Sequence, residues 1–359
     1  MSLIGRSVKR LEDRPLLTGS GRFAADVTAP DMLYMRVVRS PVAFGRLTGL
    51  RIAEALAHPD AVAIWTAEDL VEVPPIGFRM TVVPGLEPYR QPVLANGHVR
   101  YVGEPVAAVF AADPYSVEDI AELVATQIEP LAPCLDPAAP PGEFAPGRST
   151  EAAVITKAYG DLQGAFAGAH AVVSLELVVG RHSGVPLETR GSIAVRDATS
   201  GILRLYGAAK VPHYNRQALA AMLRLPLDRI HLHEGHVGGG FGIRGELYPE
   251  DVLASLAALR LGRPVKWIED RLEHLMAANH SRQQRHRVRA AVDRAGRILA
   301  IEDEFFHDQG AYLRTHGTLV ADMTAGMLPA SRVRARPGST GSAQRSPPRS
   351  TRPSAFPAR

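Results

Sequence analysis

A glycine-rich segment, VGGGFGIRGELYPED at residues 237–251, constrains this chain more than any other feature of its sequence. Four of the five positions in 238–242 are glycine, and the other is Phe241. Glycine lacks a Cβ atom, so such a backbone can adopt positive φ and bring its N–H groups close to a ligand. The segment therefore predicts a loop that binds a large, polar, phosphate-bearing cofactor. A glycine-rich turn without a ligand is the alternative.

The same glycines also match the dinucleotide-binding pattern G-x-G-x-x-G, at Gly240, Gly242 and Gly245. Residues 229–234, before the pattern, are typical of a strand, and residues 249–261, after it, are typical of a helix. Strand, glycine turn and helix follow in the order that a dinucleotide site requires. A nicotinamide-dependent dehydrogenase is therefore one open alternative.

Two physical details disfavour that alternative, although Glu269 and Asp270 do supply acids downstream. Residues 230–233 alternate between apolar and polar, whereas a central parallel strand is usually apolar throughout. Glu250 and Asp251 stand at the start of the helix, where a pyrophosphate would meet two negative charges.

Length and composition fit a multi-domain enzyme. The chain has 359 residues with 46% hydrophobic content, enough for two or three domains, and it has no run of eighteen apolar residues that would cross a membrane. Charges occur throughout the first 15 residues, so we expect no secretory signal. The one cysteine, Cys134, excludes an internal disulfide and a cysteine-built iron–sulfur cluster within these residues. We expect a cytoplasmic protein.

The basic charge of the chain is concentrated in residues 330–359. The net charge is +4, but this segment has no acidic residue and holds seven of the 41 basic ones, which leaves 34 basic against 37 acidic residues elsewhere. Those seven are Arg332, Arg334, Arg336, Arg345, Arg349, Arg352 and Arg359. The segment is rich in serine and proline and poor in apolar residues, which predicts disorder. One hypothesis is a basic arm that binds nucleic acid. The other is a loss of the reading frame near Pro329.

Hydrophobic periodicity gives a coarse set of expected elements. We expect helices at 52–57, 117–126 and 215–223, with Ser116 as the N-cap of the second. We expect strands at 61–65, 106–111, 171–179, 201–206, 265–268 and 298–306.

The glycine segment also resembles a family motif. GGGFG followed by Arg244 resembles the first molybdopterin-contacting loop of the molybdenum hydroxylases, which include xanthine dehydrogenase, aldehyde oxidase and the large subunit of aerobic carbon monoxide dehydrogenase. Further segments resemble the same family in the same order, at residues 10–27, 99–124, 208–226 and 307–312. The resemblance covers residues 1–329, and several matches in order are more specific than one glycine motif.

This resemblance implies an α+β fold with an a/b-hammerhead domain and the first part of a molybdopterin-binding domain. The implied boundaries are an N-terminal arm at 1–30, the a/b-hammerhead domain at 31–130, a Pro/Gly-rich linker at 131–150, a partial molybdopterin-binding domain at 151–329 and the tail at 330–359.

The resemblance also implies the residues that bind the cofactor. They are Gly238, Gly239, Gly240, Phe241, Gly242, Arg244 and Lys210. Lys210 stands where many family members have a glutamine that contacts a metal ligand, so it either changes the chemistry of the site or is a surface lysine. Phe241 either shapes the substrate channel or is an ordinary buried aromatic. Glu188, in PLETRG, is implied to be structural and not the catalytic base.

The implied reaction is hydroxylation of an aldehyde, an N-heterocycle or a related small molecule with oxygen from water, or oxidation of carbon monoxide. The cofactor would be molybdenum–molybdopterin in its cytosine dinucleotide form. FAD and 2Fe–2S clusters would lie on partner subunits, in a larger assembly of heterotrimers without a membrane or nucleic acid. The family's catalytic glutamate belongs to a motif that this sequence lacks, so no catalytic residue is named and we expect the chain alone to be inactive.

Two clusters of polar residues each have two possible interpretations. His231, His233 and His236 are spaced so that a strand could present the first two to a metal, or they are ordinary polar strand residues. Residues 279–286, NHSRQQRH, form either a solvated loop or a contact with the cofactor side or another subunit.

Overall fold

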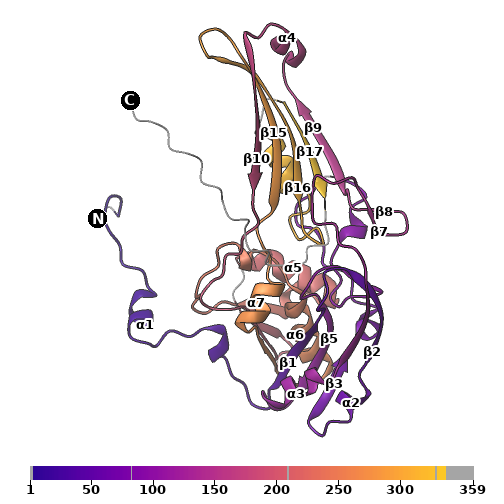
Figure 1. Cartoon of the computed structure of the whole chain (residues 1–359). Coiled ribbons are helices and arrows are strands. Elements are labelled where there is room, and N and C mark those ends of the chain that lie inside the picture. Colours follow the sequence, from indigo (N-terminus) through magenta and orange to yellow (C-terminus); the bar gives the residue numbers. More distant parts are fainter. Residues whose placement is uncertain (1–2, 82, 208–209, 328–329, 337–359) are drawn as a thin grey trace, which may run out of the picture.

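The structure is a computed structural model that describes residues 3–81, 83–207, 210–327 and 330–336 (Figure 1). A body contains most of the helices around a seven-stranded sheet, and a long five-stranded sheet projects from it at the top of the view. Both sheets are mainly antiparallel and both pack against helices, which confirms the α+β class. Within the described residues, every helix is too short or too polar to cross a membrane.

The seven-stranded sheet contains strands from both expected domains. Its order is β13-β12-β11-β14-β1-β5-β3. These strands are β1 (Leu33–Arg39), β3 (Ala61–Trp65), β5 (Pro105–Ala111), β11 (Gly191–Arg196), β12 (Leu203–Tyr206), β13 (Ile230–His233) and β14 (Val265–Ile268). In the middle, β1 lies parallel to β14, with Leu33 opposite Val265. The N-terminal strands and the later strands are therefore halves of one sheet.

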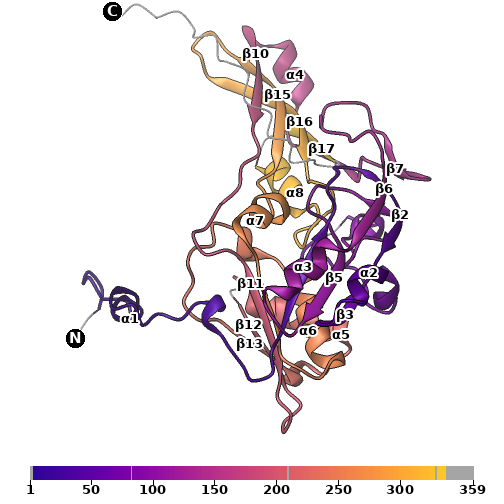
Figure 2. The same cartoon turned by 60° about the horizontal axis from the view of Figure 1, so that its bottom comes forward.

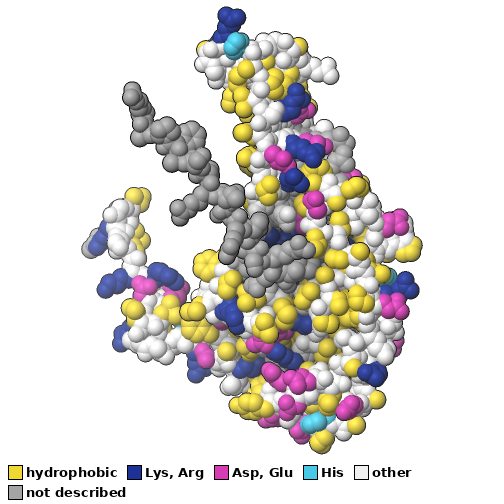
Figure 3. Space-filling view, in the orientation of Figure 1, with side chains coloured by type: hydrophobic (Ala, Val, Ile, Leu, Met, Phe, Trp, Pro, Cys, Tyr) yellow, Lys and Arg dark blue, Asp and Glu magenta, His cyan; other side chains and the backbone are white. Residues whose placement is uncertain are grey.

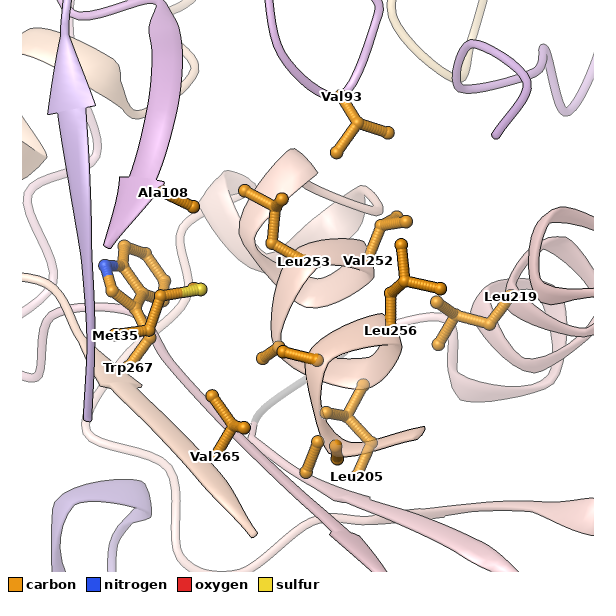
Figure 4. Close-up of a cluster of buried hydrophobic side chains, with 14 of the residues drawn as sticks. Met35, Val93, Ala108, Leu205, Leu219, Val252, Leu253, Leu256, Val265 and Trp267 are labelled. Atoms are coloured by element: carbon orange, nitrogen blue, oxygen red, sulfur yellow. The ribbon is translucent and has the colours of Figure 1, made fainter. Parts of the chain in front are cut away.

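One hydrophobic core holds these halves together (Figure 4). Met35 of β1 and Val265 and Trp267 of β14 lie near Leu253 of α6 (Pro249–Arg260). On the other side of α6, Leu219 extends the core from α5 (Pro212–Leu223). Nine of the twelve residues of α6 are buried. Each buried Val or Leu side chain stabilises the fold by about 1.5–3 kcal/mol relative to an exposed one, so this helix anchors the body.

A small three-stranded sheet lies beside the N-terminal strands, and here two predictions are wrong. It consists of β4 (His98–Val99), β2 (Gly45–Arg51) and β6 (Ala125–Pro130), next to α2 (Ala53–Leu56) and α3 (Ser116–Glu122). The helix expected to run to residue 126 ends at Glu122, because residues 125–130 pair with β2 instead. Ser116 is also not the N-cap. Its amide donates to Asp113 and its hydroxyl donates to Asp60.

The projecting sheet has two chemically different faces. Its order is β10 (Ala171–Val179), β15 (Gln283–Val292), β16 (Ile298–Asp308), β17 (Ala330–Arg336) and β9 (Ala153–Ala158). Arginines of β15 pair with acids of the neighbouring strands on one face, as in Arg285–Glu176 and Arg289–Glu302. On the other face Phe305 packs against α8 (Leu319–Gly326). Hydrophobic side chains, yellow in Figure 3, are visible along the projecting sheet. Leu175 of the edge strand β10 is half-exposed.

The prediction that disorder begins at residue 330 is wrong for residues 330–336, which form β17 between β16 and β9. Their sequence, ASRVRAR, alternates arginine with smaller residues, which is the period of a strand. The overall composition of residues 330–359 obscured this alternation. Residues 337–359, with the remaining arginines of the predicted tail, lie outside the described residues.

The expected linker and N-terminal arm both contain ordered elements. Residues 131–150 include a small hairpin of β7 (Glu143–Ala145) and β8 (Arg148–Ser149). Residues 3–19, with α1 (Asp13–Leu17), extend away from the body in both views (Figures 1 and 2). The arm joins the body further along, where Lys266 Nζ donates to the carbonyls of Ala25 and Val27. The remaining helices are α4 (Leu162–Ala167) and α7 (Arg271–Ala277).

Candidate cofactor-binding site

The glycine segment forms an irregular loop between β13 and α6. Three of its residues have left-handed backbone, Gly239 (φ 106°), Phe241 (φ 46°) and Gly242 (φ 95°). Positive φ is uncommon for a residue with a Cβ atom, so Phe241 holds a strained conformation. Its side chain is 78% exposed, which excludes an ordinary buried aromatic within the described residues. The loop therefore presents an apolar ring outward on a strained backbone.

Glu188 and Arg244 hold the loop from beneath. Glu188 Oε2 accepts hydrogen bonds from the Gly238 amide at 2.8 Å and from Arg244 Nη2 at 2.8 Å. Arg244 Nε donates to the Gly239 carbonyl at 2.8 Å, and its Nη2 also donates to the carbonyls of Glu188 and Thr189. This ion pair and its carbonyl contacts fix the path of the backbone through 238–239, as expected for the structural role of Glu188.

Arg244 faces the protein and not the open side of the loop. It is buried, and burial lowers its pKa despite the nearby Glu188. The family resemblance places Arg244 among the residues that contact a cofactor, and that stays a prediction. In the structure its guanidinium makes four contacts within the chain, so Arg244 shapes the loop from the inside.

The outer side of the loop offers unused hydrogen-bond donors. Among the described residues, the amides of residues 239–242 donate to no other group of the protein. Successive free amides on a backbone of mixed φ form a concave site for anionic groups. The loop thus presents unused donors on the side that faces away from the described protein.

The space around each glycine shows whether a ligand fits this loop, and Gly240 is the informative position. A Cβ atom at Gly238 would lie 2.4 Å from Glu188 Cβ, and one at Gly239 would lie 3.0 Å from the ring of Phe241. Packing therefore requires both of these glycines. Gly240 is different, because its φ is not in the left-handed region and a Cβ atom would meet nothing within 4 Å. The described protein does not need glycine there, whereas a close ligand would, so the loop fits a bound cofactor.

Lys210 lies beside the loop. Its amide donates to the Arg244 carbonyl at 2.9 Å, and its side chain is exposed. A Cβ atom at Gly245 would lie 3.8 Å from Lys210 Cδ. The structure therefore brings Lys210 together with the glycine loop. Its exposed cation is available to an anionic group there.

The N-terminal segment also supports the loop, which sequence reasoning missed. The Arg22 amide donates to His236 Nδ1 at 2.9 Å, and the His236 amide donates to the Arg22 carbonyl at 2.9 Å. The Ala24 amide donates to Glu188 Oε1 at 3.2 Å. His236 thus binds backbone, and His233 stacks on Tyr206 at 4.9 Å. Within the described residues, no group of histidine, cysteine or acidic side chains is arranged to hold a metal.

A buried network of charges lies below the loop and contains acidic residues that bear on the dinucleotide alternative. Glu250 pairs with Arg190 at 3.2 Å and with Arg39 at 2.6 Å. Glu269 pairs with Arg190 and with His274. Glu269, one of the two downstream acids that a dinucleotide site could use, is therefore occupied inside the protein, and the other, Asp270, pairs with Arg36 at 2.5 Å. In addition β13, the strand before the glycines, is at the edge of the sheet and not at its centre.

Two family models match the chain. Residues 18–132 match the a/b-hammerhead domain of aldehyde oxidase and xanthine dehydrogenase, and residues 145–336 match the molybdopterin cofactor-binding domain. These matches agree with the order of domains expected from the sequence, and the second match includes β17.

Similar proteins belong to the same family as these two models. The chain is 43% identical over 333 residues to the 6-hydroxypseudooxynicotine dehydrogenase complex subunit gamma of Paenarthrobacter nicotinovorans, covering 90% of this chain and 42% of that one. It is 34% identical to the nicotine 6-hydroxylase large subunit of the same organism, covering 90% and 40%. It is 31% identical to the carbon monoxide dehydrogenase large chain of Hydrogenophaga pseudoflava, covering 84% and 39%.

A solved structure shows the same fold. Quinoline 2-oxidoreductase from Pseudomonas putida 86 superposes with a TM-score of 0.85 at 33% identity, covering 94% of this chain and 45% of that one. The chain therefore spans less than half the length of these relatives. It belongs to the large, molybdopterin-binding subunit family of the molybdenum hydroxylases.

Proposed function

We propose that this chain supplies the first cofactor-holding loop of a molybdenum hydroxylase that acts on an N-heterocyclic small molecule. The main support is the glycine loop, because the space beside Gly240 is not filled by any part of the described protein. Supporting it, the relatives named above include proteins named for nicotine and quinoline, both N-heterocycles.

The residues of the loop would have distinct tasks. The free amides of residues 239–242 would donate to the acceptor atoms of the pterin or of its phosphate. Phe241, held outward, would border the substrate. Lys210 would add a positive charge beside the loop, at the position where many family members are expected to have a glutamine. When bound, the molybdenum centre would accept two electrons from the substrate and supply oxygen derived from water.

Partners complete the proposal. Electrons would leave through 2Fe–2S clusters and FAD on other subunits, and one relative is itself named as a subunit of a dehydrogenase complex. The cytosine dinucleotide form of the cofactor belongs to the same proposal. The sequence lacks the motif that holds the family's catalytic glutamate, so turnover would require a general base from elsewhere. Molybdenum-dependent hydroxylation by the purified 359-residue chain would contradict that part.

The glycine loop can be tested through cofactor retention. The full chain and its Gly240→Val variant would be produced in a host that makes molybdopterin, and released pterin would be measured by fluorescence after oxidation. We expect the unmodified chain to retain pterin and Gly240→Val to lose most of it with an unchanged Tm, because the added side chain meets only the ligand.

A matched control is Gly142→Val, another position where a Cβ atom meets nothing within 4 Å and φ is ordinary. It should retain pterin like the unmodified chain. Equal retention by Gly240→Val, or no pterin on the unmodified chain, would show that the loop does not hold the cofactor.

A further inference from the structure

A second polar site lies where the projecting sheet joins the body. Strand β15 begins there and β16 ends there, with Gln283 opposite Asp308 (Figure 1). Arg282, just before β15, donates through Nε to Gln309 Oε1 at 3.3 Å, just after β16. Arg181 Nη2 lies 2.8 Å from Asp308 Oδ2. Two guanidinium groups therefore meet at this junction.

Arg282 has no carboxylate of its own among the described side chains. Arg181 is paired with Asp308, but no acid lies within salt-bridge distance of Arg282 in the part of the chain described. The acid whose charge reaches it, Glu246, is already bound to Arg314 at 2.8 Å. Consistent with this, burial lowers the pKa of Arg282. A largely buried guanidinium without a counter-charge is unfavourable unless an anion reaches it.

Unsatisfied buried groups lie close to the two arginines of this junction. His307 is fully buried, and within the described residues neither of its ring nitrogens has a hydrogen-bond partner. Gln309 is 9% exposed and its Nε2 is likewise unpartnered, as is Nε2 of His280. Burial and the charge of Arg282 lower the pKa of His307 to about 3, so the ring is neutral at pH 7 and offers one N–H. Buried polar groups in proteins are nearly always hydrogen-bonded, so these donors indicate a missing acceptor.

The other arginines of β15 show that the situation of Arg282 is not typical of this sheet. Arg285 lies 2.5 Å from Glu176, and Arg289 lies 2.9 Å from Glu302, both on the solvent face. The sequence supplies an acid to each of these exposed arginines, yet it supplies none to the more buried one.

We propose that Arg282, Gln309, His307 and His280 form a binding site for a phosphoryl group. The guanidinium fork of arginine matches the oxygens of a phosphate, and the amide and imidazole N–H groups add donors from other segments. A carboxylate has two oxygens, which one arginine alone can satisfy, whereas this site offers more donors than that. The site rests on its own residues and does not depend on the proposed role of the glycine loop.

Inorganic pyrophosphate is the probe for this site. Its affinity for the purified full chain would be measured by titration calorimetry at constant ionic strength. We expect saturable binding to the unmodified chain, and weakening by about tenfold to a hundredfold in Arg282→Gln, because a hydrogen-bonded charge pair is lost. Arg285→Gln, which removes an exposed arginine from the same strand, should bind like the unmodified chain.

Further variants and probes keep the outcomes separate. If Arg282→Gln does not fold, Gln309→Leu removes an unsatisfied donor without changing the charge and should also weaken binding. Gly240→Val should bind pyrophosphate normally, so failure of the glycine-loop proposal would not affect this one. No binding, equal loss in Arg285→Gln, loss in Gly240→Val, or malonate binding as tightly as pyrophosphate would each overturn the assignment.

Discussion

At the scale of single residues, Glu104 links the N-terminal strands to the loop after β16. It is 1% exposed, and its Oε1 accepts a hydrogen bond from the Tyr312 hydroxyl at 2.6 Å. Burial raises the pKa of Glu104 from its ordinary 4.5 to about 7. Between these two values the folded protein binds more protons than the unfolded chain, so this group's contribution to stability decreases as pH rises from about 4.5 to about 7.

Glu104→Gln tests this sign, because glutamine resembles the protonated acid. We expect the variant to match the unmodified chain at pH 5 and to be more stable than it at pH 8. Urea unfolding midpoints at the two pH values would show this, with Glu129→Gln, an exposed residue, as the control. A variant that loses stability equally at both pH values would mean that Glu104 is bound as a carboxylate throughout.

Single residues also show what the sequence can reveal about the site. The irregular loop was predictable because a run of residues without Cβ atoms permits positive φ and close packing, as at Gly238 and Gly239. The inward direction of Arg244 was not, because an arginine that binds phosphate and one that braces a loop have the same letter. The support from Arg22 and Ala24 acts through backbone atoms, which side-chain identity does not report.

At the scale of elements, the projecting sheet is stabilised unevenly. Phe305 is fully buried against α8, whereas Leu175 of β10 is 55% exposed. We expect Phe305→Ala to lower the free energy of unfolding by about 3–5 kcal/mol, because it leaves a cavity. Leu175→Ala should change it by about 0.5–1 kcal/mol, because little buried surface is lost. Urea unfolding of both variants measures the difference, and equal effects would mean that the β10 side of this face is covered in solution.

Strands with strong alternation were predictable from sequence, and elements that depend on distant partners were not. The bounds of β3 and β10 agree with the predicted strands, because apolar and β-branched residues mark them locally. Residues 125–130 followed a helical segment without a turn signal, and only their pairing with β2 makes them a strand. Residues 330–336 were hidden by the basic composition around them, although β16 and β9 give them partners on both sides.

At the scale of the whole molecule, the two domains matched by the family models are joined by one sheet and one charge network. Arg39 of β1, in the first domain, lies 2.6 Å from Glu250 of α6 and 2.5 Å from Glu273 of α7 in the second. All three side chains are almost completely buried. The sequence predicted two domains in the right order, but pairing of β1 with β14 is a contact over more than 200 positions that no local pattern contains.

This junction predicts that the two domains unfold together. Arg39→Leu removes the cation that Glu250 and Glu273 share, leaving Glu250 with Arg190 at 3.2 Å and Glu273 with Arg36 at 3.4 Å. Removing one partner of a buried pair costs about 3–5 kcal/mol, and the remaining arginines make the lower end of that range the expected one. Because β1 and β14 are neighbours in one sheet, that loss should shift a single transition and should not separate the domains.

Calorimetry, together with the fluorescence of Trp65 in β3 and Trp267 in β14, would follow the unfolding of both halves of the sheet. Two transitions in the unmodified chain, or an Arg39→Leu variant in which only the Trp65 half melts early, would mean that the shared sheet does not couple the domains. An exposed pair in the same chain, Arg46–Glu129, gives the control, since Arg46→Leu should shift the transition by about 1 kcal/mol or less.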